Sequence, residues 1–276
     1  MDKLDFTVIG EALRTLQGMP GLPTPRRRPH SSLMIVLFTD FGLAGPYTGQ
    51  VIAVLHQRAP EVSIVSLFAD APSERPKPAA YLLAAYGAWF PAATVLLCVV
   101  DPGVGSDRRA VIVEAEGRIY VGPDNGLFDI VMRRVPEARL WEIIWQPGPL
   151  SPSFHGRDLF APVAARLAVG DAVTEMAQPA ADRSATRGWP DDLAEIVYID
   201  HYGNALTGLR GALLSPKARL IASGRSLQIA ATFSAVPPGE AFWHINSNGL
   251  AEIAVNGGRA DTTLGLAIGS EISVEG

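Results

Sequence analysis

The chain is 276 residues long, carries a net charge of -5, and is 48% hydrophobic. Its acidic balance argues against sequence-independent nucleic-acid binding and against docking on anionic lipid, because both need clustered Lys and Arg. The length fits one large or two smaller domains with a hydrophobic core that needs no disulfide bonds. The single cysteine, Cys98, excludes a disulfide framework and favours a reducing, cytoplasmic location.

Cys98 lies in an apolar run, and we expect it to be a small buried residue rather than a catalytic thiol. This run belongs to a longer uncharged segment, Ala79–Val100, whose length approaches that of a membrane span. Gly87 and Pro91 interrupt the segment, and its two parts are helix-like and strand-like. We therefore expect a buried helix followed by a buried strand, and no membrane-spanning segment.

Residues 1–33 differ from the rest of the chain. They contain the Pro-, Gly- and Arg-rich stretch GMPGLPTPRRRPHSS, which is typical of a flexible extension. They lack the basic segment followed by an apolar segment that is typical of a secretory signal. Since Met34 directly precedes the first convincing strand, two hypotheses stay open: an appended tail, or a start codon assigned upstream of the true one.

From Met34 onwards, apolar strands alternate with helical patterns, which predicts an α/β domain over residues 34–178 with helices on both faces of its sheet. The expected strands are Met34–Thr39, Val62–Leu67, Thr94–Val100, Ala110–Glu114, Arg118–Val121 and Leu140–Ile144. The expected helices are Pro46–Gln57, Ala79–Phe90, Asn125–Arg134 and Asp158–Val169.

A stretch rich in Ala, Arg, Asp and Pro follows, and it predicts a linker over residues 179–192. Beyond it the helical pattern disappears and short strands are separated by Gly, Asn, Ser and Pro, which predicts a smaller all-β domain over residues 193–276, a barrel or sandwich. The expected strands are Ala194–Ile199, Ala205–Leu209, Arg219–Ala222, Ser226–Ile229, Phe242–Asn246, Ala251–Val255 and Glu271–Val274.

Polar clusters follow several predicted strands of the first domain: TDFG, DPGVGSDRR and PDNG, with SFHGRD before its last helix. Ligands of open α/β sheets bind at the carboxyl ends of the strands, so these clusters are candidate site segments. Asp40, in the first cluster, could accept hydrogen bonds from a ribose diol, or it could simply cap a turn.

Asp101 follows an apolar strand, where burial without a partner would favour its neutral form. Arg108 lies beyond a Gly-rich turn and could fold back to hold the carboxylate ionised; a purely structural Asp–Arg pair is the alternative. His155 could act as a base near neutral pH or form an ordinary loop hydrogen bond. The nearby cluster Gly156-Arg157-Asp158 could equally be an N-cap with a salt-bridged arginine.

Two further polar segments lie in the second domain: IDHYGN, residues 199–204, and NSNGLAEIAVNGG, residues 246–258. Hairpin turns between antiparallel strands account for both. The alternative is a rim that binds a polar planar group through Asn side chains and exposed backbone.

Taken in order, these segments resemble the S-adenosylmethionine hydrolase (hydroxide adenosyltransferase) family, which is related to the fluorinase and chlorinase. The resemblance runs from about Met34 to the C-terminus and rests on TDFG, GPYTGQ, VVDPGVGSDRRA, VGPDNGL, SFHGRDLFAP, IDHYGN and NSNGLAEIAVNGG. Each motif is weak alone, but their shared order is specific. The resemblance implies hydrolysis of S-adenosyl-L-methionine (SAM) to adenosine and L-methionine, with water attacking the ribose C5′.

The resemblance also implies an N-terminal α/β domain, a C-terminal β-barrel, and a homotrimer whose active sites lie between subunits. It implies no cofactor and no metal, since SAM is the substrate. Asp101, Arg108 and His155 would hold and activate water. The implied substrate-binding residues are Asp40 at the ribose, Phe41 and Tyr202 beside the substrate, Asn204 with backbone at Val255 and Gly257 at the adenine, and Asp200 and Ser247 at the methionine end.

Halogenating relatives lack the aspartate and the histidine at the positions of Asp101 and His155, and they carry an insertion before their Asn-Gly motif. This chain keeps both residues and has only a short link between Arg109 and Pro123. The resemblance therefore favours water over halide as the nucleophile, and a halogenase is the less favoured alternative.

The chain departs from the family at a few places. Ser66–Ala69 stands where an Asp-X-Thr-His segment is usual, the next loop reads PSERPKP, Gly208 replaces an asparagine, and Asn248 is followed by Gly-Leu. Since the loop at PSERPKP helps to cover the substrate in relatives, its divergence makes a non-catalytic SAM-binding module one alternative. A metal-dependent phosphohydrolase is another, with His155 and the aspartates Asp40, Asp101, Asp124 and Asp158 as ligands.

Overall fold

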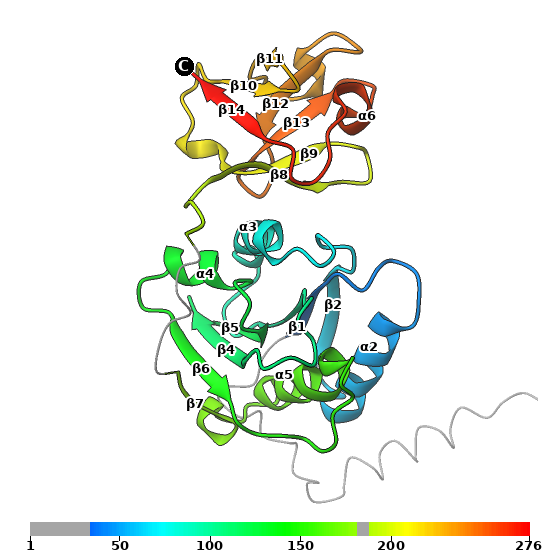
Figure 1. The fold of residues 1–276 in the computed structure, drawn as a ribbon, viewed down its shortest axis with the longest axis vertical. Coiled ribbons are helices and arrows are strands. Elements are labelled where there is room, and N and C mark those ends of the chain that lie inside the picture. Colours follow the sequence, from blue (N-terminus) through cyan, green and yellow to red (C-terminus); the bar gives the residue numbers. More distant parts are fainter. Residues whose placement is uncertain (1–33, 181–187) are drawn as a thin grey trace, which may run out of the picture.

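The computed structural model describes residues 34–180 and 188–276. The chain forms an α/β domain, drawn from blue to green, and a β domain, drawn from yellow to red (Figure 1). The predicted fold class, an α/β N-terminal domain with a smaller all-β C-terminal domain, is confirmed. The predicted flexible extension, residues 1–33, and the centre of the predicted linker, residues 181–187, lie outside the described residues.

A seven-stranded mixed sheet is the centre of the α/β domain. Across the sheet the strands are β2 (Ser63–Phe68), β1 (Met34–Thr39), β3 (Val95–Val99), β5 (Arg118–Pro123), β4 (Ala110–Ala115), β6 (Arg139–Ile143) and β7 (Ala177–Pro179). The first four pair in parallel and the remaining neighbours pair antiparallel. Strand β7 was not predicted, because three residues are too few to show an alternating pattern.

Helices cover both faces of this sheet, as predicted. Helices α2 (Tyr47–Arg58) and α5 (Ala161–Ala168) pack together on one face, and α3 (Pro76–Gly87) and α4 (Asp129–Arg134) pack on the other. In β1, Ile35 and Leu37 enter one core cluster while Val36 and Phe38 enter the other. Strand β1 is thus buried on both faces and reads as a continuous apolar run.

The long uncharged segment divides into α3 and β3, as expected. Cys98 on β3 is fully buried, and burial raises the pKa of its thiol well above the ordinary value, which argues against a nucleophilic role. Within the two described ranges, no helix is both long and apolar enough to cross a membrane.

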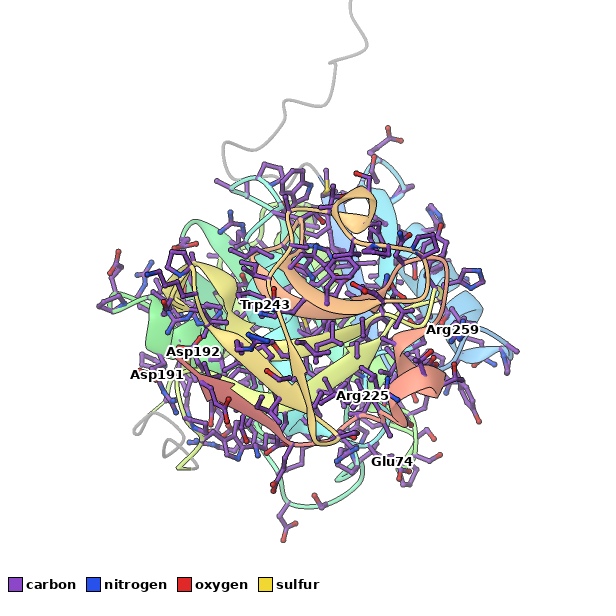
Figure 2. The ribbon with its side chains drawn as sticks, turned by 90° about the horizontal axis from the view of Figure 1, so that it is seen from above. Glu74, Asp191, Asp192, Arg225, Trp243 and Arg259 are labelled. Carbon is purple, nitrogen blue, oxygen red and sulfur yellow. The ribbon has the colours of Figure 1, made fainter. Side chains whose placement is uncertain are left out.

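Two antiparallel sheets form the β domain. One contains β12 (Ala241–Ile245), β13 (Leu250–Val255), β9 (Ala205–Arg210) and β8 (Leu193–Ile199), and the other contains β11 (Arg225–Leu227), β10 (Arg219–Ala222) and β14 (Ile272–Glu275). Bridges between Glu195 and Glu271 and between Ile229 and Trp243 join the sheets at both edges, so they close into a barrel. Trp243 is fully buried within it (Figure 2).

Short helical turns complete the structure: η1, a π-helical turn at Gly156–Phe160, the 3-10 turns η2 (Val173–Glu175), η3 (Gly211–Leu213) and η4 (Phe233–Ala235), and helix α6 (Ala260–Leu264). Helix α6 was not predicted. It spans little more than one turn before Gly265 ends it in the left-handed conformation, so it leaves no periodic signal.

Helix α3 faces the β domain (Figure 1), and the two domains share part of one hydrophobic core. The ring of Phe68 lies 5.1 Å from that of Tyr86 and 5.2 Å from that of Tyr198 on β8. The Tyr198 hydroxyl donates to Asp70 at 2.9 Å, and Lys77 pairs with Glu195 at 2.6 Å. These contacts set the position of the barrel relative to the sheet.

Candidate active site

A pocket of about 510 Å³, which we call the strand-end pocket, opens at the carboxyl ends of β1 and β3. Its lining includes four residues predicted from the sequence, Asp40, Phe41, Asp101 and His155. Ligands of open α/β sheets bind at this edge. The fold therefore brings together segments that are more than a hundred residues apart in the chain.

Asp40 and Asp101 are neighbours because their strands run in parallel. Thr39 pairs with Val99 in the β1–β3 ladder, so the residues that follow each strand emerge side by side. The backbone N–H of Glu74 donates to the Asp40 carboxylate at 2.9 Å. Burial raises the pKa of Asp40, and the negative charges of Asp101 and Glu74 act in the same direction.

Arg108 folds back onto Asp101, as the Gly-rich turn between them suggested. Its Nε lies 2.8 Å and 3.0 Å from the two carboxylate oxygens, and Nη2 also donates to Oδ2. The side chains of Asp101 and Arg108 are only 4% and 10% exposed. A fork of this kind fixes the carboxylate in direction as well as in charge.

Gly105 allows the Asp101–Arg108 turn to approach the loop that carries His155. Its φ of +80° is in the left-handed region, and a Cβ at this position would lie 2.5 Å from the carbonyl oxygen of Pro152. An L-residue with a side chain is disfavoured here on both counts. This close approach explains why Arg108 reaches a histidine from a distant segment.

Arg108 also contacts His155: its Nη2 lies 3.0 Å from the ring Nδ1. Since a guanidinium has no acceptor, Nδ1 must accept this hydrogen bond, and we assign the ring the neutral tautomer with its proton on Nε2. Burial lowers the pKa of His155, and the charge of Arg108 lowers it further. His155 is therefore a neutral hydrogen-bond donor at neutral pH.

This geometry changes the role expected for His155. The sequence suggested His155 as a base, but the hydrogen bond to its ring comes from Arg108 and occupies the lone pair of Nδ1. The free lone pairs at this site belong to the Asp101 carboxylate, whose oxygens each offer more than one acceptor position.

Asp158 makes no capping hydrogen bond to a helix, but the salt-bridged arginine expected beside it is confirmed as Arg157. Asp158 lies inside the π-helical turn η1, and its carboxylate accepts hydrogen bonds from Arg157 at 2.6 Å and from the backbone of Ser151 at 2.9 Å. It ties the loop before His155 to the start of the helix. Turns of this kind often occur at functional sites.

The aspartates proposed as alternative metal ligands are mostly engaged by arginines. Asp101 binds Arg108, Asp158 binds Arg157, and the Nε of Arg109 donates to Asp124 at 2.8 Å. In the described part of the chain, no group of three or more His, Cys, Asp or Glu side chains is arranged to hold a metal ion.

A second pocket of about 840 Å³, the barrel pocket, lies on the β domain. Its lining includes the other predicted binding residues: Asp200, Tyr202, Asn204, Ser247, Val255 and Gly257. Figure 2 shows Arg259, which also lines this pocket, at the edge of the barrel. The barrel pocket and the strand-end pocket share no lining residue.

The turn between β8 and β9 is pre-organised by its own hydrogen bonds. Asp200 accepts from the backbone N–H of Asn204 at 2.8 Å and from its side-chain amide at 2.9 Å. Gly203 has a φ of +84°, and a Cβ there would lie 2.7 Å from Arg259. The segment is thus a hairpin turn, as the simpler reading held, and it also lines a pocket.

Several pocket residues were not predicted. Tyr86, Phe233, His244, Glu252 and Arg259 line the barrel pocket, and Tyr47, Gln50 and Glu74 line the strand-end pocket. Tyr86, Phe233, His244 and Arg259 carry no local signal, because their positions follow from packing between distant elements. Tyr47 and Gln50 lie in the motif GPYTGQ, and Glu252 is a lone carboxylate inside an otherwise apolar strand, so these three did carry a signal.

The family models for the SAM hydroxide adenosyltransferase N-terminal and C-terminal domains match residues 35–177 and 194–273. The chain belongs to the SAM hydroxide adenosyltransferase family. The resemblance found in the sequence motifs is confirmed by these matches.

Members of the SAM hydroxide adenosyltransferase family similar to this chain are named (R)-S-adenosyl-L-methionine hydrolase. One from Salinispora tropica is 37% identical over 86% of this chain and 95% of its own length, and one from Thermus thermophilus is 38% identical over 86% and 98%. A crystal structure of an uncharacterized conserved protein from Thermotoga maritima superposes with a TM-score of 0.80 at 29% identity, covering 88% of this chain and all of that one.

We predict that His155 titrates below about 6.5, the ordinary value for histidine. Its pKa is lowered, so the ring stays neutral until the pH falls through that lower value. Protonation would place a proton on Nδ1 facing Arg108 and break their hydrogen bond. NMR titration of labelled histidine can measure this; substituting Arg108→Gln should raise the value, and a native midpoint above about 6.5 would contradict the assignment.

We predict that Gly105→Ala displaces His155 and lowers the free energy of unfolding by about 1–3 kcal/mol. The added methyl group meets the Pro152 carbonyl and requires an unfavourable φ. Gly224→Ala is the matched control, because its φ is +73° but nothing lies within 4 Å of the new Cβ. Urea unfolding should show strain in both variants, whereas only Gly105→Ala should shift the NMR signal of His155.

Proposed function

We propose that this protein hydrolyses S-adenosyl-L-methionine to adenosine and L-methionine. The observation that carries the proposal is the set Asp101, Arg108 and His155, held together at the strand-end pocket by hydrogen bonds of 2.8 to 3.0 Å. Relatives also support the proposal: proteins that are 37–38% identical over 86–88% of this chain are named (R)-S-adenosyl-L-methionine hydrolase.

The chemistry places its main demand on the nucleophile. The substrate sulfur is a sulfonium cation that leaves as a neutral thioether, so its departure needs no general acid, metal or cofactor. Water must instead be aligned behind C5′ and relieved of a proton. Alignment of reacting groups alone supplies several kcal/mol, with about 7–11 kcal/mol as the upper range for ideal intramolecular systems.

In the proposed mechanism, water lies between the Asp101 carboxylate and the Nε2–H of His155. A new bond forms between the water oxygen and C5′, the C5′–S bond breaks, and its electron pair stays on sulfur. The water proton passes to Asp101 and then to solvent. Arg108 holds Asp101 and His155 in one fixed arrangement, because its guanidinium donates to both.

Asp40 is proposed to hold the ribose hydroxyls. Its Oδ2 accepts from the Glu74 backbone, and the remaining lone pairs face a pocket whose lining includes Phe41. In the barrel pocket, Asn204 and the backbone near Gly257 are proposed to bind adenine, with Asp200 and Ser247 at the methionine end. Tyr202 lies at the rim, 73% exposed.

We also propose that the site is completed between subunits of a homotrimer, in the cytoplasm. The predicted residues divide between two pockets without a common lining residue, so one substrate needs both halves brought together. Large apolar side chains are exposed on both domains: Leu43 is 83% and Tyr47 51% exposed on the sheet domain, and Tyr202 is 73% exposed on the barrel. Burial against a neighbouring copy accounts for such exposure.

We predict that the native protein, incubated with SAM in isotopically labelled water, forms adenosine that carries the label at its 5′-oxygen. Asp101→Asn and His155→Ala should lower the turnover by about 10²–10⁴-fold while SAM still binds. Asp171→Asn is the matched control, because Asp171 also pairs with an arginine, Arg166 at 2.6 Å, but lines neither pocket.

Other outcomes of this experiment identify the alternatives. Binding without product would indicate a SAM-binding module, activity abolished by chelation would indicate a metal-dependent hydrolase, and a 5′-halo product that requires chloride or fluoride would indicate a halogenase. Full turnover in Asp101→Asn or His155→Ala would overturn the assigned roles.

We predict that subunits defective in different pockets complement one another. Asp101→Asn damages the strand-end pocket and Asn204→Ala the barrel pocket. Random mixed trimers would carry about a quarter of their sites with both halves intact. Co-expression should therefore recover about a quarter of the native activity. A mixture no more active than the separate variants would contradict a site shared between subunits.

A further inference from the structure

Glu252 is a carboxylate buried in the barrel pocket, and the roles proposed above leave it without a function. It lies on β13 opposite His244 of β12, and the whole residue is 7% exposed. Every other residue of Leu250–Val255 is apolar. Burying a carboxylate is strongly unfavourable unless it is hydrogen-bonded and paired with a cation.

Two neighbours fix this carboxylate in place. His244 Nε2 lies 3.3 Å from Oε1, and the side-chain amide of Asn246 donates to Oε2 at 3.0 Å. A carboxylate offers about four acceptor positions, and these two contacts use only part of that capacity. Glu252 can therefore accept a further hydrogen bond from a ligand in the pocket that it lines.

The same contacts tie Glu252 to the turn that carries Ser247. Asn246 Oδ1 accepts from the backbone N–H groups of Asn248 at 2.9 Å and Leu250 at 3.0 Å, while its amide donates to Glu252. Through Asn246, the carboxylate is thus linked to the turn that carries the residue proposed to hold the methionine end of the substrate.

A second carboxylate, Asp200, lies in the same pocket. The charges of both Glu252 and Asp200 act on the Tyr86 hydroxyl and, together with burial as the main cause, raise its pKa to about 12. Arg259, the guanidinium among the described lining residues, is engaged by Asp261 at 2.8 Å. This end of the pocket is therefore suited to a small cation.

We propose that Glu252 binds a primary ammonium group, the α-ammonium of an amino-acid ligand, together with Asp200. Its carboxylate accepts a charge-assisted hydrogen bond from the ammonium, which selects ligands with a free amino group. The identification of that ligand as SAM rests on the proposed function, whereas the preference for an ammonium rests on the pocket itself.

The test compares two ligands on the full-length protein in the Asp101→Asn background, which prevents turnover during calorimetry. One ligand is SAM, and the other is its deaminated analogue, which keeps the sulfonium, adenosine and carboxylate groups. Adding Glu252→Gln should weaken SAM binding by about 10-fold or more, since hydrogen bonds to charged groups are worth about 1.5–3 kcal/mol. Binding of the deaminated analogue should change less than about 2-fold.

Control variants separate recognition from folding. Glu240→Gln removes an exposed carboxylate of the same domain outside the barrel pocket and should leave both affinities unchanged. Glu252→Asp keeps the charge on a shorter side chain and should retain a preference for SAM over the analogue. Equal losses for both ligands, or no loss in Glu252→Gln, would show that Glu252 does not recognise the ammonium.

The role of Glu252 can be tested independently of the proposed function. If the native protein neither binds nor hydrolyses SAM, that function fails, and the same variants are then compared with L-methionine and its deaminated analogue as ligands. A native protein that binds L-methionine no better than the deaminated compound would overturn the assignment of Glu252 as well.

Discussion

The guanidinium of Arg108 is shared between a buried carboxylate and a neutral imidazole, and the rest of the site is arranged around it. It donates to both oxygens of Asp101 and to Nδ1 of His155, so three side chains from two loops behave as one rigid group. Burial and the charge of Arg108 both lower the pKa of His155 and favour its neutral form, and Arg108 occupies Nδ1. In the proposed mechanism the imidazole is therefore the donor and the carboxylate the acceptor. The position of Arg108 is supported by the ring of Phe160, 5.2 Å from the guanidinium carbon.

The surrounding fold maintains this arrangement through backbone geometry. Parallel pairing of β1 and β3 places Asp40 next to Asp101, and Gly105 lets the turn after β3 reach the loop before η1. Gly156 has a related role, since a Cβ there would lie 2.9 Å from the ring of Phe41. Glycines at these positions are therefore explained by the approach of other segments as well as by chain flexibility.

The barrel packs directly against the α/β domain. Phe68, Tyr86 and Tyr198 form an aromatic cluster across the boundary between the domains, and Tyr86 also lines the barrel pocket. Helix α3, which carries Tyr86, therefore packs on the core of the sheet and also contributes to the lining of the barrel pocket. Within one chain, the two pockets carry complementary halves of the proposed chemistry: water activation at the sheet edge, and recognition of the adenine and amino-acid ends on the barrel.

The sequence by itself determined the fold class, most element positions and, through the resemblance carried by its polar motifs, some of the residues that line each pocket. Hydrophobic periodicity and the order of the polar motifs are local properties of the chain. The sequence could not reveal β7 or α6, because both are too short to show a period. Only the tertiary structure decided that Arg108 bonds to His155, that Asp158 belongs to a π-helical turn, and that Glu252 faces a pocket. Each of these depends on which distant segments come into contact, and that is set by strand pairing and core packing rather than by the residues nearby in sequence.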